Sequence, residues 1–125
     1  MNIDYDKIKS ILNKNGFYFE KRYGQNFLTD EKLLNELVEK AGVTASDTVI
    51  EIGVGAGTLT AALAKKAKRV IGYEIDKKLQ PVLKETLADY KNAEIVFKDI
   101  MKEPMSEIES RAGGRFSVVA NLPYY

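Results

Sequence analysis

The sequence contains no cysteine, no histidine and no tryptophan among its 125 residues. Without cysteine there is no disulfide bond and no thiolate nucleophile, and without histidine the usual general base and the commonest metal ligand are missing. The chain also lacks any run of about 18 apolar residues that would predict a membrane-spanning helix, and its polar, acidic start does not resemble a signal peptide. We therefore expect a cytoplasmic protein without a membrane segment, whose chemistry uses neither a thiol, an imidazole nor a metal.

Apolar residues are numerous enough for one modest core. Hydrophobic residues make up 45% of the chain, which predicts one domain or part of one. The formal net charge is only +1, so the overall charge does not indicate a nucleic-acid partner, and any such contact must be local.

Three glycines at alternate positions follow the apolar, β-branched run at residues 48–52: Gly53, Gly55 and Gly57. The run predicts a strand, and the pattern after the glycines predicts a helix. Glycine permits a positive φ and lets a ligand approach the backbone, while the start of the helix directs unpaired N–H groups to the same place. This stretch predicts the floor of a nucleotide-type site at the carboxyl end of the first strand of a parallel sheet; a purely structural turn is the alternative.

The spacing of the glycines favours one cofactor over another. A dinucleotide site has the pattern G-x-G-x-x-G, but here the third glycine is Gly57 and position 58 is threonine. With Glu51 the pattern becomes E-x-G-x-G-x-G, which resembles the cofactor loop of S-adenosylmethionine-dependent methyltransferases. A NAD-binding module remains the rival interpretation.

Two further predicted strands also end in acidic residues. Glu74 and Ile75 follow the strand predicted at 69–73, and Asp99 and Ile100 follow the strand predicted at 93–97. Glu74 lies about twenty residues beyond the first glycine, where a doubly wound fold has the acid that accepts hydrogen bonds from ribose hydroxyls. Asp99 is suited to bind the exocyclic amine of an adenine held between Ile75 and Ile100, although a simple turn or cap residue is the alternative.

A fourth strand is predicted at 116–120, and its composition predicts burial on both faces. It is followed by Asn121, Leu122, Pro123 and Tyr124. The Asn121 oxygen and the Leu122 carbonyl are acceptors suited to the hydrogens of an exocyclic amine, Pro123 fixes the turn, and an extruded base can stack on Tyr124. These four residues predict a catalytic site for methylation of adenine N6, which needs positioning more than a strong base.

The amino-terminal part offers a second kind of signal. A helix is predicted from Asp4 to about residue 15, and another from Thr29 to Gly42. Between them, Lys21 and Arg22 are interleaved with aromatic residues, a pattern found where cations meet phosphates and rings meet bases. The arm is therefore a candidate RNA-binding segment, and the alternative is an arm that packs its aromatic residues on the domain.

Together these motifs resemble the amino-terminal part of the ribosomal RNA adenine-N6,N6 dimethyltransferases, the KsgA-type enzymes of the small ribosomal subunit. The resemblance rests on Gly-Gln-Asn-Phe-Leu at 24–28, the glycine loop, Tyr-Glu-Ile-Asp at 73–76, Lys-Asp at 98–99 and Asn-Leu-Pro-Tyr at 121–124. It implies a Rossmann-like α/β fold, S-adenosylmethionine as cofactor, and small-subunit ribosomal RNA as the partner whose two adjacent adenosines are dimethylated. The cofactor-binding residues implied or predicted are Gln25, Asn26, Leu28, Glu51, Gly53, Gly55, Gly57, Glu74, Ile75, Asp99, Ile100 and Asn121.

The resemblance also divides the chain and limits what it does alone. Residues 1–28 correspond to the helix and arm, and residues 29–125 to a methyltransferase core truncated after its fourth strand, because the family continues with further strands and a helical RNA-binding domain. We expect the fourth strand to be an exposed edge, and the 125 residues alone to retain the fold and weak cofactor binding with little catalysis. The alternatives are a large-subunit enzyme of the macrolide-resistance type and a non-catalytic RNA-binding factor.

Overall fold

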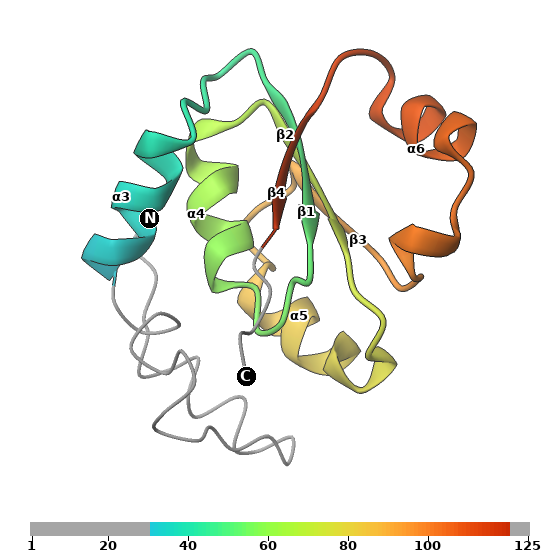
Figure 1. Ribbon diagram of the computed structural model, residues 1–125. Coiled ribbons are helices and arrows are strands. Elements are labelled where there is room, and N and C mark those ends of the chain that lie inside the picture. The colour runs from blue at the N-terminus through green and yellow to red at the C-terminus, as the bar shows by residue number, and fades with distance from the viewer. Residues whose placement is uncertain (1–30, 121–125) are drawn as a thin grey trace.

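The computed structural model describes residues 31–120, and the predictions for residues 1–30 and 121–125 lie outside that part. Helices and strands alternate along it (Figure 1). The helices are α3 (Glu31–Lys40), α4 (Thr58–Lys66), α5 (Gln80–Thr86) and α6 (Met105–Ala112), with short 3-10 helices η1 (Lys77–Leu79) and η2 (Ile100–Lys102). The strands are β1 (Thr48–Ile52), β2 (Arg69–Tyr73), β3 (Ala93–Val96) and β4 (Ser117–Ala120).

The four strands form one parallel sheet in the order β3-β2-β1-β4. The pairs Ile52–Tyr73, Tyr73–Val96 and Ile52–Ala120 lie in register, so every strand ends at the same edge. In Figure 1 the strands point towards the bottom of the view, where that carboxyl edge lies. The α/β fold with a parallel sheet is therefore confirmed, as are the predicted second, third and fourth strands to within one residue.

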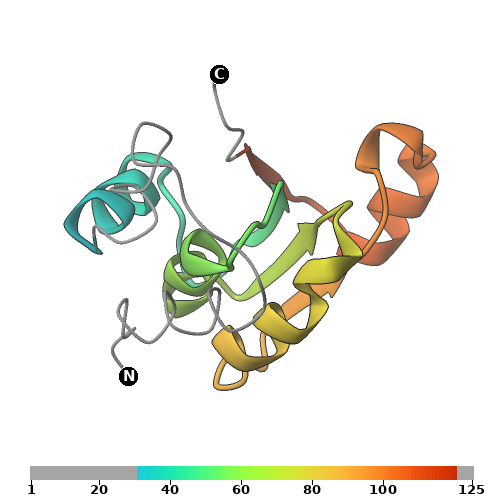
Figure 2. The same ribbon diagram turned by 90° about the horizontal axis from the view of Figure 1, so that it is seen from below.

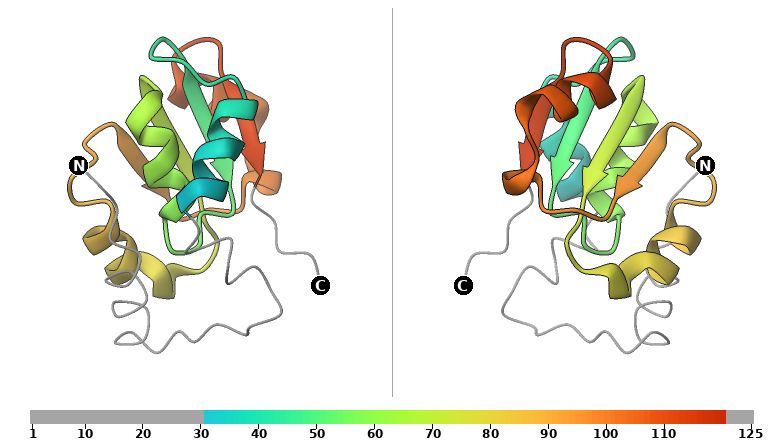
Figure 3. Two further views of the ribbon diagram at one scale, coloured as in Figure 1. Left: turned by 90° about the vertical axis from the view of Figure 1, so that its left-hand side faces the viewer. Right: turned by 90° about the vertical axis from the view of Figure 1, so that its right-hand side faces the viewer.

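Helices cover both faces of the sheet, as the views from below and from the two sides show (Figures 2 and 3). On one face α3 and α4 bury Leu34, Leu59 and Leu63 against β1 and β2, and α5 packs on the same side beneath the glycine loop. On the other face α6 buries Ile108 against Ile50 and its neighbours. The spacing of Leu59, Leu63 and Ala67 predicts an inner side for α4, and all three residues are buried there.

Two predictions about individual elements were wrong. The predicted burial of β4 on both faces fails, because β4 pairs only with β1 among the described residues and Val118 is 54% exposed. The alternative expectation of an exposed edge strand is confirmed. Pro81 and the apolar residues at 79–87 predict a helix that residues 90–92 end, but in the structure α5 ends at Thr86 and the chain then turns to begin β3.

No helix within residues 31–120 is long and apolar enough to span a bilayer. Within the same residues, no three histidine, cysteine or carboxylate side chains gather in a way that would hold a metal ion.

Candidate functional site

The candidate site is the carboxyl edge of the sheet, where the chain leaves each strand. The glycine loop follows β1, Glu74 follows β2, and Asp99 lies three residues beyond the end of β3. Ala120, the residue before Asn121, pairs with Ile52 at the end of β1. Because parallel strands end at one edge, four segments separated by up to 68 positions in the sequence leave the sheet side by side.

The glycine loop has the backbone conformation that its sequence predicts. The φ values are 80° at Gly53, 59° at Gly55 and 89° at Gly57, in the left-handed region that residues with a Cβ rarely adopt. A Cβ at Gly55 would have no atom within 4 Å, so this position faces open space. A Cβ at Gly57 would instead lie 2.9 Å from Leu83 Cδ2, because α5 packs closely beneath the loop. One glycine therefore leaves room for a ligand, and another permits close packing.

Glu74 connects the ends of β1 and β2. Its Oε1 accepts a hydrogen bond from the Gly55 N–H at 2.8 Å, and its Oε2 accepts one from the Asp76 N–H at 2.9 Å. The residue is only 8% exposed, so the two bonds hold the carboxyl group in one orientation. A carboxylate has about four acceptor sites, and Glu74 therefore retains acceptor capacity for hydroxyl groups of a ligand placed over the loop.

Glu51 lies within the protein, beneath the loop. It is 0% exposed, the Thr60 hydroxyl of α4 donates a hydrogen bond to its Oε1, and its Oε2 has no partner within residues 31–120. Burial raises the pKa of Glu51 from 4.5 to about 8; the bond from Thr60 opposes this rise, and the charge of Glu74 adds to it. The hydroxyl of Thr58, at the start of α4, is also buried and has no partner in the described part of the chain. Two buried polar atoms near the start of α4 are thus unpaired among these residues.

Asp99 and its neighbours form the β3 side of the edge. Asp99 Oδ1 accepts a hydrogen bond from the Met101 N–H at 3.0 Å, which caps η2 and leaves the other carboxyl oxygen available. Ile75 is 69% exposed and Ile100 is partly buried. Asp76 caps η1 in the same way, through the Lys78 N–H at 3.0 Å. Asp99 therefore caps a helix, as the alternative interpretation predicts, but only one of its carboxyl oxygens makes the capping bond.

Sequence reasoning missed the threonines that hold the loop in place. Thr60 bonds Glu51, and the Thr86 hydroxyl of α5 donates a hydrogen bond to the Ala56 carbonyl at 2.9 Å. The two bonds join residues 9 and 30 positions apart in the sequence. The available signal for Thr60 was a polar residue beside Leu59 and Leu63 on the apolar face of α4.

Several predicted site residues lie outside the described residues. They are Lys21, Arg22, Gln25, Asn26, Leu28, Asn121, Leu122, Pro123 and Tyr124. Of the others, the structure gathers Gly53, Gly55, Gly57, Glu74, Ile75, Asp99 and Ile100 at the carboxyl edge, with Glu51 beneath it.

The chain is similar to known proteins over most of its length. The family model described as "Ribosomal RNA adenine dimethylase" matches residues 16–125. The chain is 46% identical over 123 residues to the ribosomal RNA small subunit methyltransferase A of Bacillus mycoides, covering 96% of this chain and 42% of that protein. It therefore spans less than half the length of the curated relatives that it matches.

Solved structures show the same likeness. The structure of the 23S rRNA methyltransferase ErmE is 33% identical with a TM-score of 0.63, over 76% of this chain and 36% of that one. A dimethyladenosine transferase from Plasmodium falciparum is also 33% identical, with a TM-score of 0.59, over 75% of this chain and 32% of that one.

Proposed function

The chain belongs to the ribosomal RNA adenine dimethylase family, and from that premise we propose that it forms the cofactor-binding part of an S-adenosylmethionine-dependent enzyme that dimethylates adenosine N6 in small-subunit ribosomal RNA. The choice of the small subunit follows the name of the relative that is 46% identical over 96% of the chain. The large-subunit alternative is supported by a match of 33% identity over 76% of the chain. Action on ribosomal subunits also implies a cytoplasmic location.

The observation that carries the proposal is the carboxyl group of Glu74. The Gly55 and Asp76 N–H groups hold it at the mouth of a loop whose Gly55 faces open space. This combination suits a nucleoside cofactor. The ribose hydroxyls of such a cofactor need an acceptor that is held in place, and the part of the cofactor that lies against the loop needs a backbone without a Cβ. The residues present therefore fit S-adenosylmethionine.

Each side of the edge has a proposed role in holding the cofactor. Glu74 accepts hydrogen bonds from the ribose hydroxyls, and Asp99 accepts one from the adenine amine through the oxygen that η2 does not use. Ile75 and Ile100 enclose the adenine ring. Gly53, Gly55 and Gly57 bring the backbone close to the methionine part, with Glu51 below them. Gln25, Asn26 and Leu28 complete the site by resemblance.

The proposed catalytic segment follows β4. When bound, the cofactor supplies an activated methyl group, so the chain need not supply a strong base. Asn121 and the Leu122 carbonyl accept hydrogen bonds from the adenine N6 hydrogens, and Pro123 fixes that carbonyl. Tyr124 stacks on the extruded base, while Lys21 and Arg22 bind RNA phosphates. Because these acceptors require no proton to be removed beforehand, the lack of histidine and cysteine is consistent with the chemistry.

Titration calorimetry of the 125-residue chain tests the cofactor half of the proposal. We expect S-adenosylmethionine to bind, NAD not to bind, and Glu74→Gln to weaken binding by about tenfold, since one charge-assisted hydrogen bond contributes about 1.5 kcal/mol or more. Glu109→Gln, which removes one exposed carboxylate from α6, is the matched control and should bind normally. Preferential binding of NAD, or equal losses in the two variants, would refute the proposed site.

A chimera tests the reaction. In it, this chain replaces the matching part of the Bacillus mycoides relative, and the product is assayed for methyl transfer to small- and large-subunit ribosomal particles. We expect transfer to the small-subunit particles, and loss of that transfer with Asn121→Ala while cofactor binding persists. Methylation confined to large-subunit RNA would establish the alternative.

A further inference from the structure

The opposite end of the sheet, where the strands begin, carries an excess of positive charge. Every strand of a parallel sheet begins at one edge, so the ends of the preceding helices and the loops into the strands gather there (Figure 1). We call this region, residues 38–49, 64–70, 88–94 and 109–117, the basic end. It holds eight lysine or arginine and five acidic residues, whereas the remaining described residues hold six and nine.

The densest part of the basic end is the run Lys-Lys-Ala-Lys-Arg at 65–69. Lys65, Lys66 and Lys68 are exposed, and no ion pair within the described residues involves them. Ala67, between them, is buried, and the N–H groups of Lys68 and Arg69 both donate to the Asp47 carbonyl. The run is therefore fixed to the loop before β1, and it presents three unpaired ammonium groups from an ordered backbone.

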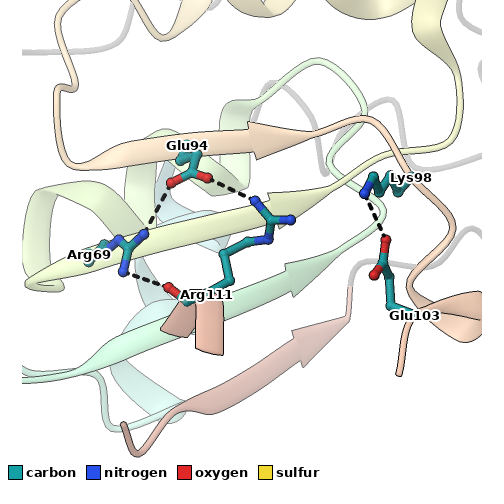
Figure 4. A network of polar contacts seen from close by, with 5 residues as sticks. All are labelled: Arg69, Glu94, Lys98, Glu103 and Arg111. Carbon is teal, nitrogen blue, oxygen red and sulfur yellow. Dashed lines mark hydrogen bonds and ion pairs between the residues drawn. The ribbon is translucent and has the colours of Figure 1, made fainter. Parts of the chain in front are cut away.

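Two of the five acids at the same end are engaged elsewhere. Glu94 of β3 lies between Arg69 of β2 and Arg111 of α6, at 3.1 and 3.6 Å (Figure 4). Asp47 accepts hydrogen bonds from the N–H and hydroxyl of Thr44. Among the described residues, neither acid forms an ion pair with Lys65, Lys66 or Lys68. The remaining acids of this end, Glu39, Asp89 and Glu109, are exposed.

Helix dipoles do not account for the whole arrangement. Lysines in the last turn of a helix are favoured by the negative end of its dipole, which explains Lys65 and Lys66 of α4. It does not explain the exposed Lys68, Lys91 and Arg115, which lie in the segments between the helices and the strands. What these residues share is their position at one end of the sheet.

We propose that the basic end is a second RNA-contact surface, which binds the phosphate backbone of ribosomal RNA away from the edge that holds the cofactor. The inference rests on the proposed function, because that function supplies a large polyanionic substrate. Strands of four or five residues rise about 3.3 Å per residue, so about 15 Å separates the two edges. RNA bound at the basic end is therefore a part of the substrate other than the adenosines that react, and it is bound without sequence preference.

Salt dependence of RNA binding tests this surface. Fluorescence anisotropy of a labelled RNA duplex of arbitrary sequence is measured with the chain and with Lys65→Gln/Lys68→Gln. Each phosphate contact contributes about 0.7–0.9 to the slope of log K against log salt, so losing two should reduce the slope by about 1.5. The affinity lost between 50 and 200 mM salt should then shrink about tenfold. Lys32→Gln/Lys84→Gln, which removes the same charge from exposed positions elsewhere, should leave the slope unchanged.

A second variant and a second ligand make the result unambiguous. Lys91→Gln/Arg115→Gln changes two other loops of the basic end and should reduce the slope similarly, with circular dichroism confirming that each variant is folded. Equal slopes for the test and control pairs would overturn the inference. It would also be overturned if the substitutions in the basic end weakened the binding of a poly-glutamate peptide more than the binding of RNA. S-adenosylmethionine is titrated into the same samples. Normal cofactor binding with equal slopes refutes this inference alone, whereas absent cofactor binding refutes the proposed function.

Discussion

The buried carboxyl group of Glu51 makes the stability of this chain depend on pH in a calculable way. In the folded protein its pKa is raised to about 8 from 4.5, chiefly because burial disfavours the charged form. Between these values the folded state binds a proton that the unfolded state has released, so the free energy of unfolding falls as pH rises. The contribution of Glu51 to the free energy of unfolding is fully present below pH 4.5 and is lost as the pH rises through about 8.

The magnitude follows from the linkage relation. The free energy of unfolding changes by 1.36 kcal/mol for each pH unit over which the two states differ by one proton. Between pH 6 and pH 8 the loss is about 2 kcal/mol, and between pH 8 and pH 9 it is only a few tenths. Glu51→Gln stays neutral throughout and retains an oxygen that accepts the Thr60 hydrogen bond. The variant should therefore gain about 2 kcal/mol relative to the natural chain between pH 6 and pH 8.

Urea unfolding followed by far-ultraviolet circular dichroism at pH 5, 6, 7, 8 and 9 measures this difference. The chain has no histidine, so the α-amino group is the other group that ordinarily titrates between pH 6 and 8, and it is common to both proteins. Glu109→Gln, on the exposed surface of α6, controls for the loss of a carboxylate. If the natural chain and Glu51→Gln showed parallel stability curves from pH 6 to 8, the raised pKa of Glu51 would be refuted.

Two further predictions concern the glycine loop. Gly57→Ala should lower the free energy of unfolding by roughly 2–3 kcal/mol, because φ is 89° and the new Cβ would lie 2.9 Å from Leu83. Gly55→Ala should lower it by only about 1 kcal/mol but should weaken cofactor binding, because a Cβ there would enter open space where the ligand lies. Thermal unfolding and calorimetry of both variants check this, and the reverse order of stabilities would contradict it. Thr86→Val should cost about 1 kcal/mol, because the Ala56 carbonyl loses its hydrogen bond; urea unfolding measures the loss, and an unchanged midpoint and slope would show that the bond does not stabilise the loop.

Much of the candidate site was predictable because its signals are local. The alternation of glycines after an apolar run identifies a strand, a turn and a helix within about fifteen residues, and the structure has β1, the loop and α4 at those positions. Glu74 and Asp99 were predicted at one edge because strands in a parallel sheet all end there. That argument needs only the positions of the strands and not their order.

The environment of each residue was not predictable in the same way. Residues 117–120 have the composition of a buried strand, yet β4 lies at the edge of the described sheet and Val118 is 54% exposed, because burial depends on which elements cover a strand. Glu51 was predicted as a cofactor-binding acid from its place before the glycines. Its 0% exposure, its bond from Thr60 and its raised pKa depend on how α4 packs over β1.

The sequence by itself determined where the strands, the turns and the acidic residues at the strand ends lie, since propensity and periodicity act over a few neighbouring residues. Only the tertiary structure decided the order β3-β2-β1-β4, the bond that Glu74 makes to the Gly55 N–H, and the gathering of the lysines and arginines at the opposite end. These features join residues up to tens of positions apart, and packing between separate elements, rather than local preference, brings such residues together.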